Sequence, residues 1–149
     1  MADRIENKSV RKVSRLSDRQ IEEIYPSLAR KAKRIYDERL RRRSIISLPI
    51  FDEPGWDMLL DLYWHRAQGR KISVSSACLA SNAPSTTALR YLLLLEENGW
   101  VESTESNLDK RTRLVAITDL AVRAISQYLA GAKGASNEEG SEMYLIKKN

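Results

Sequence analysis

A chain of 149 residues is long enough for one compact domain with additional segments. Its single cysteine excludes an internal disulfide, and one histidine without a glycine-rich phosphate loop or a cysteine pair predicts neither an enzyme nor a metal or cofactor site. No apolar run could cross a bilayer and the polar N-terminus is no secretory signal, which predicts a cytoplasmic protein without membrane contact.

The formal net charge of +5 is concentrated in the N-terminal third of the chain. Residues 1–43 hold 14 Lys or Arg against 7 Asp or Glu (+7), whereas residues 44–149 hold 11 against 13 (−2). Such an asymmetry favours an anionic partner, and nucleic acid is the usual one for a chain of this kind.

The chain begins with a basic segment, residues 1–16, that has too few large apolar side chains to bury itself. We expect it to be a flexible arm. Two interpretations remain open, a solvated tail without a role and an extension that reaches the minor groove of DNA.

An amphipathic helical segment follows at residues 17–44. Ser17 and Gln20 fit a capping box at its start, and Pro26 predicts a break or kink that leaves a short first piece and a longer second one. The arginines within residues 39–43 either oppose the helix dipole or contact phosphates.

Residues 45–51 indicate an extended connection, after which Pro54 opens a helix that Gly69 closes. Residues 71–73 predict a short strand that pairs with a later hairpin, and residues 74–82 predict a short helix. The residues of this short helix expected to be buried are Ala77, Leu79 and Ala80.

A second helix is predicted from Pro84 to Gly99, with Ala88, Leu92 and Leu95 on its buried face. Pro84 suits a first helical position, and Gly99 suits the left-handed residue that ends a helix. Because so tight a turn separates it from the preceding helix, the pair predicts a helix-turn-helix.

A β-hairpin follows, with a first strand from Val101, a turn at residues 107–113 and a second strand at residues 114–117. Thr118 or Asp119 then caps a final helix. The residues expected to form its buried stripe are Ala121, Ala124, Ile125 and Tyr128.

The predicted fold class is mainly α with a small β-hairpin, a winged helix-turn-helix with an added N-terminal helix. Its domain organisation is a basic arm (1–16), a helical segment (17–44), a winged helix domain (45–131) and a small acidic tail (132–149) that ends in a short apolar patch.

Four stretches in order, Arg90, residues 95–101, residues 109–111 and residues 114–118, resemble the MarR family of bacterial transcription regulators. The resemblance spans roughly residues 56–129. Its most specific part is a Leu-Glu-x-x-Gly-x-Val helix end followed by an Asp-x-Arg wing and an apolar strand ending in Thr. It implies a sequence-specific double-stranded DNA-binding transcription regulator that acts as a homodimer through terminal helices.

The resemblance also implies which residues contact DNA. They are Ser85, Thr86, Thr87 and Arg90 on the recognition helix and Lys110, Arg111 and Arg113 on the wing. Arg90 suits a bidentate contact with guanine and the hydroxyls suit bases or phosphates, although Ser85 equally suits helix capping. Asp109 is expected to restrain Arg111 through a charge-assisted bond.

Leu93 and Leu94 depart from the family pattern, which often has polar or charged residues there. Either the recognition helix is buried on more sides, or the N-terminal segment covers it. We therefore expect the apolar stripe of residues 17–44 to pack on a second subunit, on Leu93 and Leu94 of the same chain, or on both. The alternative function is a winged helix that docks a protein through this surface.

Two regulatory features stay open in the sequence. Cys78 lies among small apolar residues and is either a small core residue or a redox-sensing thiol, which some relatives use. A small-molecule effector of unknown identity belongs to the expected partners, although effector pockets of the family lie between domains and have no local signature.

Overall fold

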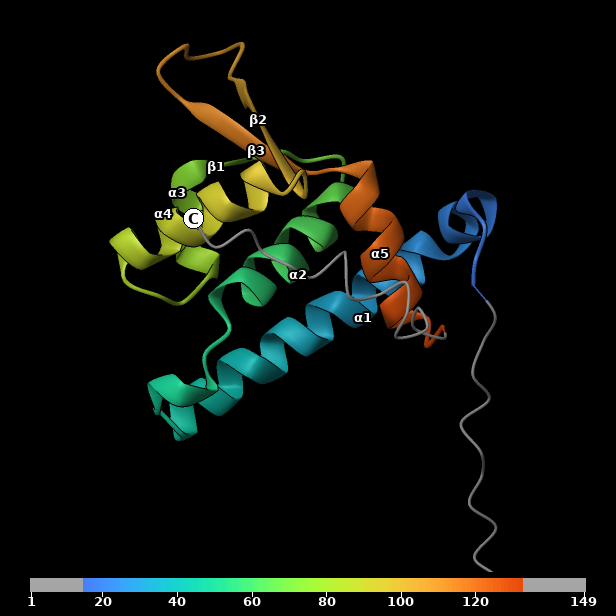
Figure 1. Ribbon diagram of the computed structural model, residues 1–149, viewed down its shortest axis with the longest axis horizontal. Coiled ribbons are helices and arrows are strands. Elements are labelled where there is room, and N and C mark those ends of the chain that lie inside the picture. Colours follow the sequence, from blue (N-terminus) through green and yellow to red (C-terminus); the bar gives the residue numbers. More distant parts are fainter. Residues whose placement is uncertain (1–14, 133–149) are drawn as a thin grey trace, which may run out of the picture.

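The computed structural model describes residues 15–132, which form five α-helices, a short 3-10 helix and a three-stranded sheet (Figure 1). The elements are α1 (Asp18–Ile45), η1 (Pro49–Phe51), α2 (Pro54–Ala67), β1 (Ile72–Ser73), α3 (Val74–Ala80), α4 (Ser85–Glu97), β2 (Val101–Glu105), β3 (Arg113–Ile117) and α5 (Asp119–Leu129). This order of elements confirms the predicted winged helix-turn-helix with an added N-terminal helix. Most of the basic arm and of the acidic tail lies outside the described residues.

The sheet has the antiparallel order β1-β3-β2. Ile72 of β1 faces Val115 of β3, which confirms that the short strand pairs with the hairpin. Val101 of β2 faces Ile117, and these two side chains are buried with Val115. The inner end of the hairpin therefore belongs to the core, whereas its outer end projects beyond the helices (Figure 1).

Helix α2 lies at the centre of the core, and Met58, Leu60 and Tyr63 are completely buried. The Tyr63 hydroxyl lies 2.7 Å from the hydroxyl of buried Ser126, and the Tyr25 hydroxyl donates to the Tyr63 carbonyl oxygen over 2.7 Å. Burial raises the pKa of Tyr63 to about 12. These bonds tie α1 and α5 to α2 without leaving a buried hydroxyl unpaired.

Helix α1 is continuous through Pro26, so the predicted break into two pieces is wrong. The proline removes one intrahelical hydrogen bond, but its side chain is exposed. Ile21 on one side and Leu28 and Ala29 on the other are buried in the same core. Tertiary packing of both halves thus overrides the local cost of the proline.

The apolar stripe of α1 packs on α2 and α5 of its own chain. Its capping box is confirmed, because the Ser17 hydroxyl accepts from the Gln20 backbone N–H and the Gln20 side chain accepts from the Ser17 N–H. The alternative that α1 folds over Leu93 and Leu94 is wrong, since both leucines remain exposed.

Helix α5 faces the core with a stripe rotated from the predicted one. Its buried residues are Ala121, Val122, Ile125, Ser126 and Leu129. Ala124 and Tyr128, predicted to be buried, are exposed, because they lie one position from Ile125 and Leu129, or about 100° around the axis. Tyr128 instead packs edge-on against Trp56, with ring centroids 5.5 Å apart.

An ion pair between Arg39 and Asp57 joins the C-terminal half of α1 to the first turn of α2. Both side chains are largely buried. The Nη1 atom of Arg39 also lies 3.4 Å from the Oε1 atom of Glu53. Burial raises the pKa of the Asp57 carboxyl, and the neighbouring guanidinium opposes this rise. Arg39 therefore compensates a carboxylate that would be costly to bury alone.

Replacing Arg39 with methionine should lower the free energy of unfolding by about 3 kcal/mol at pH 7, because Asp57 then stays buried without its cation. Without Arg39 the pKa of folded Asp57 rises further above its unfolded value. The deficit should therefore shrink as the pH falls through that raised pKa toward the unfolded one. Urea unfolding at a series of pH values measures both effects.

The matched control is Arg41→Met, which changes an exposed arginine on the same helix and should cost about 0.5 kcal/mol or less. Equal losses from the two variants, or a pH-independent loss from Arg39→Met, would contradict a structural role for the buried pair.

Candidate nucleic-acid interface

The turn between α3 and α4 is held by its own polar side chains. The hydroxyl of buried Ser81 donates to the Cys78 carbonyl oxygen over 2.6 Å and accepts from the Ala83 N–H over 3.2 Å. Asn82 has a left-handed backbone with φ of 57°, which reverses the chain direction. The hydroxyl of Tyr36 on α1 donates to the Ala80 carbonyl oxygen over 2.9 Å, so α1 braces the turn.

Helix α3 confirms the predicted burial of Ala77 and Ala80, but Leu79 is 79% exposed and its predicted burial is wrong. The helix is only seven residues long, and its neighbours cover a single face of it. Burial raises the pKa of the Cys78 thiol. Because the thiolate is the reactive form, a raised pKa favours the core role of Cys78 over a redox role.

Helix α4 presents its first turn to solvent. Pro84, predicted to be the first helical residue, is the N-cap, so the helix begins one residue later than predicted. No side chain caps the helix. Ser85 therefore does not serve as the cap. Within residues 15–132, the hydroxyls of Ser85, Thr86 and Thr87 form no hydrogen bond and so remain available to a ligand.

Arg90 lies on the exposed side of α4. It is two residues after buried Ala88 and two before buried Leu92, which places it roughly 200° around the axis from Ala88. Its guanidinium makes no ion pair or hydrogen bond with the part of the chain that the structure describes. The exposed helix thus combines a long cationic side chain with short hydroxyls at its N-terminal end.

The wing is the hairpin of β2 and β3, and its turn is closed by backbone bonds. The Ser106 N–H donates to the Thr112 carbonyl oxygen over 2.9 Å. Asp109 accepts from the backbone N–H of Arg111 over 2.9 Å, so it braces the backbone of the turn rather than the guanidinium. This corrects the expected charge-assisted bond, and the side chains of Lys110 and Arg111 extend into solvent.

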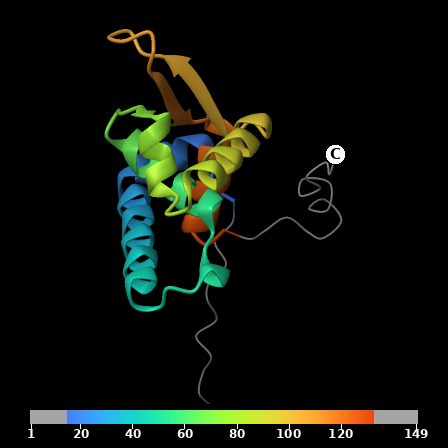
Figure 2. The same ribbon diagram turned by 90° about the vertical axis from the view of Figure 1, so that its left-hand side faces the viewer.

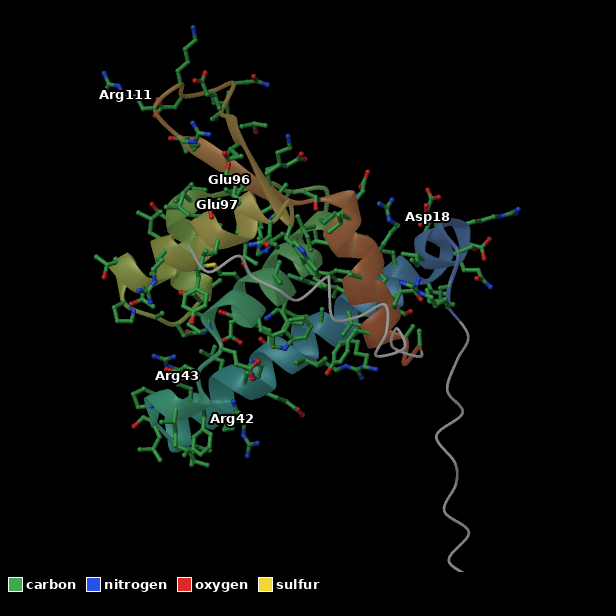
Figure 3. The ribbon with its side chains drawn as sticks, viewed as in Figure 1. Asp18, Arg42, Arg43, Glu96, Glu97 and Arg111 are labelled. Carbon is green, nitrogen blue, oxygen red and sulfur yellow. The ribbon has the colours of Figure 1, made fainter. Side chains whose placement is uncertain are left out.

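Arg113 is held differently from the two cations at the tip. Its guanidinium donates to the Ser103 hydroxyl oxygen over 2.7 Å, and that hydroxyl donates to the Glu96 carboxylate over 2.7 Å. The chain of bonds joins the end of α4 to both strands of the wing. Figure 3 shows Glu96 at the base of the wing and Arg111 at its tip. The sequence did not indicate this bond between Arg113 and Ser103.

The wing and the helix-turn-helix lie at one end of the molecule. In both ribbon views the hairpin rises beside α3 and α4, whereas the C-terminal end of α1 lies at the opposite end (Figures 1 and 2). Arg42 and Arg43 lie at that far end (Figure 3). Arg42 donates to the Phe51 carbonyl oxygen over 3.0 Å and Arg43 pairs with Asp52 at 3.1 Å. These two arginines hold the connection to α2 rather than joining the wing.

Three leucines of α4, Leu89, Leu93 and Leu94, are exposed. The helix packs on α2, α3 and β2 through the face of Ala88 and Leu92. Neither expected explanation for Leu93 and Leu94 holds among the described residues, because the helix is not buried on further sides and α1 does not cover it.

Neither a metal site nor a membrane-spanning helix is evident in residues 15–132. No group of three or more His, Cys, Asp or Glu side chains is arranged to hold a metal ion there. Among the described helices, none combines the length and the apolar character needed to cross a bilayer. A groove of about 630 Å³ does lie between α1, α2 and α5, lined by Ile35, Trp56, Trp100 and Tyr128 among others.

No protein-family model matches the chain, and no curated protein matches its sequence. Several solved structures resemble its fold. A mutant of MepR from a multidrug-resistant S. aureus clinical isolate is 18% identical, with a TM-score of 0.46, over 82% of this chain and 88% of that one.

The heme sensor protein PefR, in complex with heme and carbon monoxide, is 15% identical with a TM-score of 0.45, over 74% of this chain and 72% of that one. Reduced AbfR bound to DNA is 18% identical with a TM-score of 0.41, over 81% and 82%. Identities and TM-scores this low transfer no ligand or partner to this chain, whose function has to be argued from its own residues.

Substitutions at Asn82 should test the left-handed turn. Asn82→Ala should lower the free energy of unfolding by about 1 kcal/mol, because a β-carbon without a local hydrogen bond disfavours this backbone. Asn82→Gly, the matched control, should cost less, because glycine adopts positive φ freely. Thermal unfolding of both variants measures the difference, and an alanine variant as stable as the glycine variant would contradict the strain.

Proposed function

We propose that this protein is a sequence-specific, double-stranded DNA-binding transcription regulator that acts as a homodimer. The observation that carries the proposal is that one structural unit, α3 and α4 with the hairpin beside them, exposes both Arg90 of α4 and the cations of the wing tip. A recognition helix in the major groove beside a wing on the backbone requires this arrangement.

The recognition helix would enter the groove with its N-terminal half. Arg90, exposed and unpaired among the described residues, has the reach for a bidentate contact with guanine. Ser85, Thr86 and Thr87 have uncommitted hydroxyls at the helix N-terminus, where backbone N–H groups also favour phosphate. Base readout is therefore assigned to Arg90 and helix positioning to the hydroxyls.

The wing would supply contacts that do not depend on sequence. Lys110 and Arg111 stand at the tip of a turn that Asp109 stiffens, and neither cation is paired within residues 15–132. Such cations neutralise phosphates or enter the minor groove and release counterions. Arg113 would act through the wing's orientation, since Ser103 holds its guanidinium.

Arg90→Ala should weaken binding to the preferred sequence by about 1–3 kcal/mol and relax base preference, because it removes a base contact. Arg111→Ala should weaken binding to all sequences alike and lower the salt slope by about 1, because it removes a phosphate contact. Selection from random DNA defines the preferred sequence, and salt titrations of full-length protein measure both changes.

The matched control is Arg30→Ala, an exposed arginine on α1, which should bind DNA as the wild type does. Unchanged operator affinity of Arg90→Ala would remove the direct-readout role. If the wild type binds DNA without salt dependence, or not at all, the DNA-binding proposal is wrong and a protein-docking winged helix becomes the better interpretation.

Homodimerisation needs a surface other than the α1 stripe, which its own chain covers. Ile45, Leu48 and Ile50 form an exposed apolar corner at the end of α1 and in the connection to α2. This corner lies at the opposite end of the molecule from the wing (Figure 1). Two copies joined there would leave both recognition helices uncovered, and we propose the corner as the dimer contact.

Ile45→Asp/Ile50→Asp should convert the dimer into a monomer, because it places charges in an apolar contact. Light scattering after gel filtration gives the mass, and the DNA footprint should change from an inverted repeat with half-sites ~10 base pairs apart to a single half-site. Leu108→Asp, which alters a fully exposed leucine of the wing turn, is the control for mass. A wild-type monomer would refute the dimer.

We also propose that the groove between α1, α2 and α5 receives a small-molecule effector. Its walls include Trp56, Trp100 and Tyr128, and Arg39 and Glu53 add charge. Trp100 directly precedes β2, so a ligand in the groove would contact the residue that joins α4 to the wing. Concave aromatic surfaces with few polar groups are typical of small-molecule sites.

A further inference from the structure

The exposed leucines of α4 are the feature of the candidate interface that phosphate and guanine contacts leave unexplained. Leu89 is 44% exposed and Leu93 is 50% exposed, on the helix that carries Arg90. A bulky apolar side chain gains nothing from phosphate, and its exposure to water is unfavourable. Such residues on the face of a recognition helix need an apolar partner.

The two leucines form one ridge because they are four residues apart. Thr86 and Arg90, also four residues apart, form the adjacent ridge about 60° around the axis. Both ridges lie away from Ala88, which the core covers. A groove that receives Arg90 would therefore also receive Leu89 and Leu93.

The major groove offers one prominent apolar group, the C5-methyl of thymine. We propose that Leu89 and Leu93 read thymine by packing against this methyl group, so that the operator contains thymine at positions beside the base contacted by Arg90. This inference rests on the proposed DNA-binding function and names the chemistry of its specificity. The leucines would thus be specificity-determining residues.

The test replaces single thymines by deoxyuracil, which removes only the methyl group and keeps the base pair. In operators obtained by selection from random DNA, the full chain should lose about 3- to 10-fold in affinity at one or two thymines of each half-site. Every other thymine in the half-site should tolerate the exchange. Fluorescence anisotropy with duplexes that differ at one position gives the ratio.

The variants Leu89→Ala and Leu93→Ala should still bind the operator, more weakly, and each should bind the thymine and uracil duplexes equally at the position it reads. Leu120→Ala, a leucine of α5 that is 47% exposed, is the matched control and should keep the wild-type ratio. Circular dichroism verifies folding. If Leu93→Ala does not fold, Leu93→Gln takes its place. The ratio of wild-type affinities for the thymine and uracil duplexes tests the proposal without any variant.

The outcomes separate the two proposals. Salt-dependent binding of the wild type with no loss at any uracil position would overturn the thymine contact and leave DNA binding intact. An unchanged thymine preference in both leucine variants would also overturn it. If selection yields no bound DNA, the proposed function fails and the thymine contact with it.

Discussion

Burial of the inner end of the hairpin against the helical core is the constraint on which the arrangement of the candidate interface depends. Val101, Val115 and Ile117 are buried there, and each large apolar side chain contributes about 1.5–3 kcal/mol. The exposed bonds from Glu96 through Ser103 to Arg113 contribute roughly 0.5–1.5 kcal/mol each. Packing therefore anchors the wing, and the polar chain adjusts its direction relative to α4.

Much of this arrangement could be predicted because local signals and packing agree. Gly99, with φ of 75°, ends α4 where a left-handed residue is needed, and Val101 begins β2. The exposure of Ser85 and Arg90 follows from the helical phase set by Ala88 and Leu92. Where these signals coincide, the sequence contains enough information to locate the helix, the wing and the exposed face of the helix.

The remainder depended on contacts between distant residues, which local patterns do not contain. Pro26 stays inside α1 because residues on both sides of it share one core. Leu79 is exposed because no element within residues 15–132 covers that side of α3. Asp109 could have bonded either the guanidinium or the backbone of Arg111, and only the geometry of the turn selects the backbone. The same holds for Tyr36, whose bond to the α3–α4 turn spans 44 positions.

The charge asymmetry of the sequence has a different meaning once the arginines are placed. Arg39, Arg42 and Arg43 direct their hydrogen bonds to Asp57, Phe51 and Asp52 of the same chain. The cations at the wing tip are few, so electrostatic attraction from the described interface alone is modest. Under the proposed function, specific affinity would therefore have to come from close contacts within the DNA groove, and this raises the importance of the apolar ridge of Leu89 and Leu93 beside Arg90.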